Sequence, residues 1–128
     1  MPLISKKTLN RAHVICNIPL KKSELQNGDL CMIRDGSVGI YIEKTNKEQS
    51  KAFGTLYQRS VIVFFLAAYA DISYYPTEFY TEDLKDKDDD TKYDVMKIIR
   101  GSWDFDIENP IAVEAFLKNK YNYMSYFK

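Results

Sequence analysis

A strand–turn–strand pattern in the first third of the chain constrains the fold most strongly. Residues 30–34 and 38–42 are rich in apolar and β-branched side chains. Between them stands Asp35-Gly36, a pair favoured in two-residue hairpin turns because such turns need positive φ. The pattern therefore predicts a β-hairpin and, with it, an antiparallel sheet.

Three further runs extend the predicted sheet. Residues 55–66 are rich in β-branched and aromatic side chains and predict a long strand. Residues 74–80 contain Pro76, whose missing N–H restricts the run to an edge strand or a turn. Residues 93–99 predict the last strand, and the polar residues 45–51 predict a loop or a short helix.

The C-terminal region predicts a helix over residues 110–126. Asn109 is a good N-cap, and Pro110 suits the first helical position. Apolar side chains recur at helical spacing to form one face: Val113, Phe116, Leu117, Tyr121 and Met124.

Strands followed by one helix predict an α+β fold rather than alternating βαβ units. We expect a small antiparallel β-barrel or a strongly bent sheet, with the C-terminal helix packed on it. The 128 residues form a single domain by length, with a β-rich core over residues 12–100.

Charge is balanced overall but unevenly distributed. The formal net charge is zero, which makes a nucleic-acid partner unlikely because phosphate contacts need a basic surplus. Residues 1–60 carry ten Lys/Arg and five Asp/Glu, whereas residues 61–128 carry eight and thirteen. Such a chain folds one half against the other or pairs with copies of itself, and a homo-oligomer stays open.

The sequence predicts a cytoplasmic protein without a membrane anchor. Cys16 and Cys31 are too few for a disulfide framework, and we expect both to be reduced, buried thiols. The first twenty residues never sustain the apolar run of a signal peptide. The longest apolar run, over residues 61–70, falls short of the roughly 20 residues that span a bilayer.

Two segments resemble small phage and prophage proteins of uncharacterised function. They read NGDLCMIRDGSVGIYI and YTEDLKDKDDDTKYDVMKIIR, a Gly-centred hairpin and a charged loop that leads into a strand. The resemblance implies an SH3-like β-barrel and a viral or mobile-element origin, and it assigns no residue a function. The aromatic stretch over residues 64–80 and the C-terminal helix depart from the compact version of those proteins.

The charged loop gives little support to a metal site. Asp86, Asp88 and Asp90 stand at positions one, three and five of a calcium loop. An EF-hand then needs Gly at position six and Glu at position twelve, where this chain has Thr91 and Lys97. We therefore interpret the loop as a solvated turn between strands and expect no metal.

No enzymatic motif is recognisable. His13 and Cys16 are three residues apart, but their strand-like surroundings would point them to opposite faces. Phosphate-binding glycine loops, nucleophile elbows and zinc-binding HExxH patterns do not occur. We expect no catalytic residue, no cofactor and no enzymatic activity.

Aromatic side chains at the C-terminus are the interaction candidates. Phe116, Tyr123, Tyr126 and Phe127 supply rings of the kind that is enriched at the centres of interfaces. On a helix, Phe116, Tyr123 and Phe127 would form a stripe separate from the core-facing one. Either that stripe binds a partner, or the helix uses both stripes within its own fold.

The sequence thus favours a non-enzymatic, phage-like protein that acts by stoichiometric contact with a host protein or with itself. Inhibition of a host defence component, in the host cytoplasm, is one such role. One alternative is a sponge for a nucleotide second messenger, with Arg34, Arg59 and Arg100 on phosphates and Trp103 on a base. Another is a virion accessory or structural protein.

Overall fold

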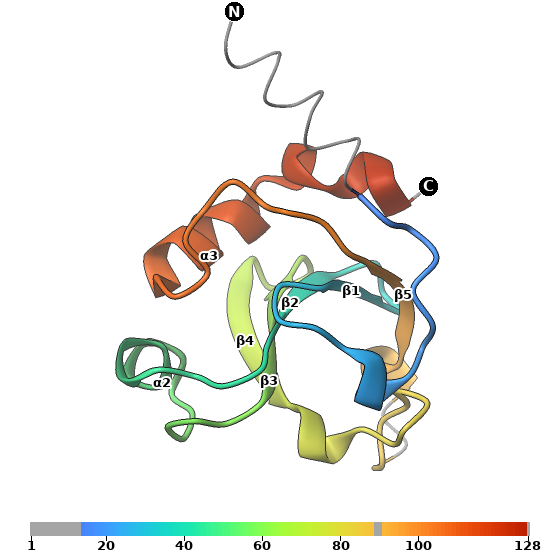
Figure 1. Cartoon of the computed structure of the whole chain (residues 1–128), viewed down its shortest axis with the longest axis horizontal. Helices are drawn as coiled ribbons and strands as arrows, with labels where there is room; N and C mark the ends of the chain where they lie inside the picture. The colour runs from blue at the N-terminus through green and yellow to red at the C-terminus, as the bar shows by residue number, and fades with distance from the viewer. Residues whose placement is uncertain (1–13, 89–90, 128) are drawn as a thin grey trace, which may run out of the picture.

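One antiparallel sheet with two α-helices beside it makes up the fold (Figure 1). A computed structural model describes residues 14–88 and 91–127. The strands are β1 (Leu30–Ile33), β2 (Val38–Ile42), β3 (Val61–Leu66), β4 (Asp71–Pro76) and β5 (Val95–Ile99). The α-helices are α2 (Lys47–Phe53) and α3 (Pro110–Lys118). Short 3₁₀ turns are η1 (Lys22–Glu24), η2 (Thr77–Phe79), η3 (Thr91–Tyr93), η4 (Lys120–Asn122) and η5 (Met124–Phe127).

The sheet is open. Its strands lie in the order β4-β3-β2-β1-β5, and every neighbouring pair is antiparallel. The predicted α+β class is confirmed. The closed-barrel alternative is wrong, because β4 and β5 remain separate edges in the described part of the chain.

The predicted hairpin is formed by β1 and β2, but its turn is longer than the sequence suggested. The Gly36 N–H donates to the Ile33 carbonyl at 2.9 Å, and the Ile33 N–H donates to the Ser37 carbonyl at 2.9 Å. The loop therefore has three residues, not two. Gly36 has φ +89°, the left-handed conformation that three-residue hairpin loops place at this position.

Strand β3 begins at Val61, so the prediction of a strand from residue 55 is wrong for its first six positions. Thr45 holds this segment as a loop. Its hydroxyl donates to the Leu56 carbonyl at 2.7 Å, and its N–H donates to the Arg59 carbonyl at 3.1 Å. The short helix allowed for residues 45–51 is α2. The edge strand predicted around Pro76 is β4, but it spans Asp71–Pro76 instead of residues 74–80, and residues 77–79 form η2.

Strand β5 begins two residues later than predicted, because Tyr93 belongs to η3. The Tyr93 carbonyl accepts the hydroxyl of Tyr80 at 2.5 Å instead of joining the ladder. Val95 then pairs with Ile33 on β1.

Helix α3 starts where predicted, with the Asn109 side chain accepting the Ile111 N–H, but it ends at Lys118 rather than near residue 126. Side chains from the following turns take its last carbonyl groups. The Tyr123 hydroxyl donates to the Leu117 carbonyl, and the Asn122 amide donates to the Phe116 carbonyl. The segment after Lys118 therefore folds back as η4 and η5.

Both faces of the sheet are covered. On one face, α3 and η5 pack Val113, Leu117 and Phe127 against the strands. On the other face, the segment between β4 and β5 contributes Tyr80 and Leu84 to a second cluster. Because both faces are covered, every residue of β2 is buried.

Candidate functional site

The C-terminal aromatic residues lie in or against the core. Tyr123 and Phe127 are 2% and 6% exposed, and Phe116 and Tyr126 pack their partly buried rings beside Trp103. The arrangement matches the alternative in which these rings serve the fold itself. Tyr121, which was expected on the core-facing side, is instead 97% exposed because the helix has already ended.

The three arginines proposed for phosphate binding do not converge. Arg34 reaches Asp94 at 3.4 Å and the Thr91 carbonyl at 3.1 Å from the β1–β2 turn. Arg59, ahead of β3, pairs with Glu78. Each guanidinium is thus bound to a carboxylate of its own neighbourhood.

Arg100 and Trp103 come together at the turn that precedes β1. Arg100 binds the buried Asp29 carboxylate through two N–H···O contacts of 2.8 and 2.9 Å, and the Trp103 indole donates to the Gly28 carbonyl at 2.8 Å. The hydrogen bond to Asp29 raises the pKa of Arg100. Both side chains therefore fix the turn rather than face a ligand.

The charged loop is organised by backbone hydrogen bonds to its acids. Asp94 accepts the Asp86 N–H at 2.8 Å, and Asp86 accepts the Asp88 N–H at 3.1 Å. Asp90 lies outside the described residues. Among the residues that the structure describes, no group of three His, Cys, Asp or Glu side chains is placed to hold a metal ion.

One of the two thiols differs from expectation. Cys31 is buried as predicted, and burial strongly raises the pKa of its thiol. The prediction that Cys16 is also buried is wrong, because this residue lies on the exposed segment before η1. His13 lies outside the described residues, so the His13–Cys16 pairing has no structural account.

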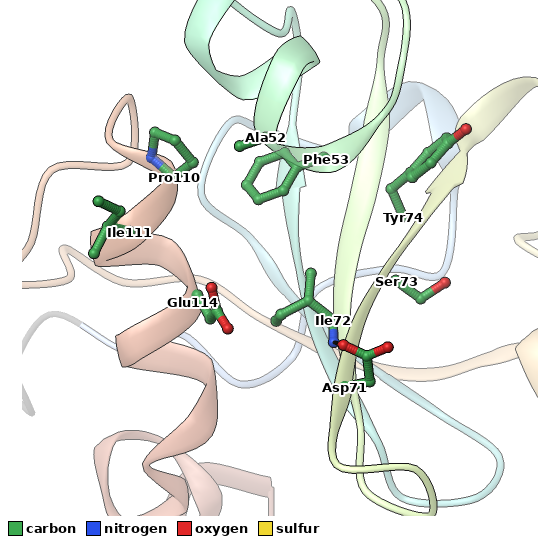
Figure 2. Close-up of a pocket in the computed structure, with 9 residues that line it drawn as sticks. All are labelled: Ala52, Phe53, Asp71, Ile72, Ser73, Tyr74, Pro110, Ile111 and Glu114. Carbon is green, nitrogen blue, oxygen red and sulfur yellow. Dashed lines mark hydrogen bonds between the residues drawn. The ribbon is translucent and has the colours of Figure 1, made fainter.

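A groove of about 270 Å³ lies between α2, α3 and the edge strand β4 (Figure 2). Phe53 and Ile72 point into it from α2 and β4, and Ile111 and Glu114 line the α3 side. The full lining is Ala52, Phe53, Asp71, Ile72, Ser73, Tyr74, Pro110, Ile111 and Glu114. None of these was singled out from the sequence as a binding residue.

Two side chains at the start of α2 connect the two helical walls of the groove. Asn46 and Gln49 form a capping box that starts α2. The same two side chains reach the segment ahead of α3, where Gln49 donates to the Ile107 carbonyl at 2.7 Å and Asn46 to the Glu108 carbonyl at 3.0 Å. The groove walls are thus tied to each other by hydrogen bonds.

The third wall is the edge of β4 rather than one of its faces. Four consecutive residues of the strand, 71–74, line the groove. Successive side chains of a strand point to opposite faces, so a wall made of consecutive residues follows the strand edge. The one sequence signal for this wall is Pro76, which marked the run as an edge strand.

The two edges of the sheet are treated differently. At β5, the chain pairs with both ends of the edge, because Ile15 and Arg100 exchange hydrogen bonds of 2.7 and 2.8 Å and the Val95 N–H donates to the Leu84 carbonyl at 3.0 Å. At β4, no described residue outside the sheet accepts or donates a backbone hydrogen bond to the strand. Among the described residues, the β4 edge therefore has no backbone partner at either end or between them.

Comparison with protein-family models, curated proteins and solved structures found no match. None of the helices formed by the described residues is long and apolar enough to cross a bilayer.

Proposed function

We infer that the protein is a non-enzymatic binding protein that acts by stoichiometric contact with another protein. The observation that supports this role is the groove between α2, α3 and β4. It combines apolar walls, held in place by the Asn46 and Gln49 hydrogen bonds, with an open strand edge. Concave apolar surfaces with a few polar groups are the usual binding sites of proteins.

The partner class comes from the sequence resemblance. On that resemblance, the proposed partner is a host protein in the host cytoplasm, such as a component of a defence system. That the bent sheet is SH3-like belongs to the same proposal. The nucleotide-sponge alternative has less support, since Arg34, Arg59 and Arg100 each hold a carboxylate in a different place.

The test is the native mass of the tagged protein with and without bacterial lysate, followed by quantification of the purified complex. We expect a larger species with a fixed integer ratio of the two proteins. Ile111→Glu, which places a charge at the 78% exposed rim of the groove, should abolish it.

Tyr121→Glu is the matched control, because this side chain is also exposed but does not line the groove. An unchanged mass in lysate would contradict the binding role. Chemical modification of the partner by much less than one equivalent of the protein would also contradict it, because that would indicate catalysis.

A further inference from the structure

The β4 edge presents backbone groups at alternate positions. The Thr77 N–H donates to the Ser60 carbonyl at 3.0 Å, which makes this pair a hydrogen-bonded one. Pairing alternates along an antiparallel ladder, so Ser73 and Tyr75 bond to β3, whereas Ile72 and Tyr74 direct their N–H and C=O groups outward. The outward position of Pro76 agrees with this, because proline lacks the N–H group that an inward position would need for bonding to β3.

One of the outward-facing backbone groups of β4 is hydrogen-bonded to a side chain of the protein itself. The Ile72 N–H donates to the Asp71 carboxylate at 2.8 Å, so the side chain next to it occupies the site that a neighbouring strand would fill. Carboxylates and other charged groups commonly protect edges in this way. An incoming carbonyl can replace the Asp71 oxygen without any movement of the sheet.

The size of the groove favours a slim occupant. Sites for small organic ligands typically enclose roughly 300–1,000 Å³, whereas this groove holds about 270 Å³ and is only partly enclosed. An extended peptide fits such a site, because its backbone pairs with the strand edge and alternate side chains enter the groove.

The charges of the groove restrict the sequence of that peptide. The charged residues that line it are Asp71 and Glu114, both acids. The Glu114 carboxylate forms an ion pair with the Lys118 ammonium group on the next turn of α3, at 2.9 Å, and both side chains remain about half exposed. A Lys or Arg side chain in the groove would therefore find two carboxylates.

We propose that the groove binds an extended segment of the partner protein by adding it as a sixth strand beside β4. The segment pairs its backbone with Ile72 and Tyr74, places apolar side chains against Phe53 and Ile111, and carries a Lys or Arg toward Glu114. This proposal rests on the binding role inferred above and specifies which part of the partner is bound.

The probe is a set of linear peptides selected from a random displayed library on the immobilised full-length protein. Peptides that also bind the Ile111→Glu variant are discarded. We expect the remainder to share apolar residues at alternate positions and a basic residue, and to bind as synthetic peptides in fluorescence anisotropy.

N-methylation of the peptide backbone then separates strand addition from other modes of binding. Only alternate N–H groups of an added strand face β4, so methylation at every second position should weaken binding about five- to tenfold, with little effect between them. Glu114→Gln should weaken a Lys-containing peptide about two- to fivefold, while Glu43→Gln, exposed and outside the groove, should not.

Three results would overturn the proposal. They are the absence of groove-dependent peptides, an N-methyl profile without the period of two, and a concentration-dependent dimer that Ile111→Glu abolishes. The last result would make a second copy the occupant. A stoichiometric host complex in the lysate experiment would survive all three, so failure here is distinguishable from failure of the binding role.

Discussion

Among the glycines, Gly39 has the least room for a side chain. A Cβ atom at this position would lie 2.5 Å from Cδ1 of Phe64 and 2.7 Å from Cγ2 of Ile62. Phe64 is opposite Gly39 in the β2–β3 pair and fully buried, so its ring has nowhere to move. We expect Gly39→Ala to lower the free energy of unfolding by about 1–3 kcal/mol, as overpacked cores do, measured by chemical denaturation.

A double-mutant cycle identifies the contact responsible. In a Phe64→Leu background the smaller side chain leaves space, and Gly39→Ala should cost clearly less there than in the wild type. Equal costs in the two backgrounds would show that the loss comes from the Ile62 contact or from the backbone of β2, and not from the Phe64 ring.

The two thiols should react very differently. Cys16 is exposed, whereas Cys31 is fully buried and its raised pKa keeps it protonated. A thiol reagent at neutral pH should label one cysteine in the native protein and both in denaturant, as counted by mass spectrometry. Cys16→Ser should remove all labelling of the native protein, and rapid native labelling of this variant would contradict the buried position of Cys31.

Among the elements, the C-terminal turns carry more of the core than their irregular form suggests. Truncation after Asn119 removes Tyr123 and Phe127, two buried aromatic side chains. Loss of one such ring typically costs about 3–5 kcal/mol, and a domain has only about 5–15 kcal/mol in total. We expect the truncated chain to be unfolded by circular dichroism and by dispersion of amide NMR signals.

The control is Tyr121→Ala in the full-length chain. Its side chain is almost fully exposed, so the free energy of unfolding should change by no more than about 0.5 kcal/mol. A folded truncated protein would instead revive the interpretation of the C-terminal aromatic residues as a separate interaction surface.

Local signals were sufficient for some elements and not for others. The Asp35-Gly36 turn and the Asn109-Pro110 helix start depend on neighbouring residues, and both were predictable. The start of β3 depends on Thr45, more than ten residues away, and the end of α3 depends on the fold-back of Tyr123. The residue types around these positions do not indicate that either contact will form.

The candidate groove was unpredictable for the same reason at the scale of the whole molecule. Its walls come from α2, β4 and α3, which are separated by long stretches of chain, and hydrogen bonds from Gln49 to Ile107 bring two of them together. Sequence analysis could identify aromatic residues and arginines as chemical types. It could not show that Tyr123 and Arg100 would be used inside the fold.

Stability of the whole protein should fall at alkaline pH. Burial raises the pKa of Tyr123 to about 12 and raises that of Tyr80 further, whereas a phenol in the unfolded chain has a pKa of about 10. The folded state therefore holds these protons more tightly than the unfolded state. Their contribution is complete below pH 10 and is lost as the pH rises toward and beyond 12.

Tyrosinate absorbance and circular dichroism measured over the same pH range test this. Of the ten tyrosines, we expect the last to ionise only as the far-ultraviolet signal disappears. Tyr123→Phe should make the fall in stability above pH 10 shallower. Ionisation of all ten before any unfolding would mean that Tyr80 and Tyr123 are accessible to solvent.

The unequal edges of the sheet also have a practical consequence for anyone who handles the protein. An uncovered strand is a template on which further copies can stack, and a chain of zero formal charge has little electrostatic repulsion to prevent it. Concentrated samples should therefore precipitate most readily close to neutral pH. A short peptide that occupies β4 would then act as a solubiliser, and its presence would extend the shelf life of the preparation.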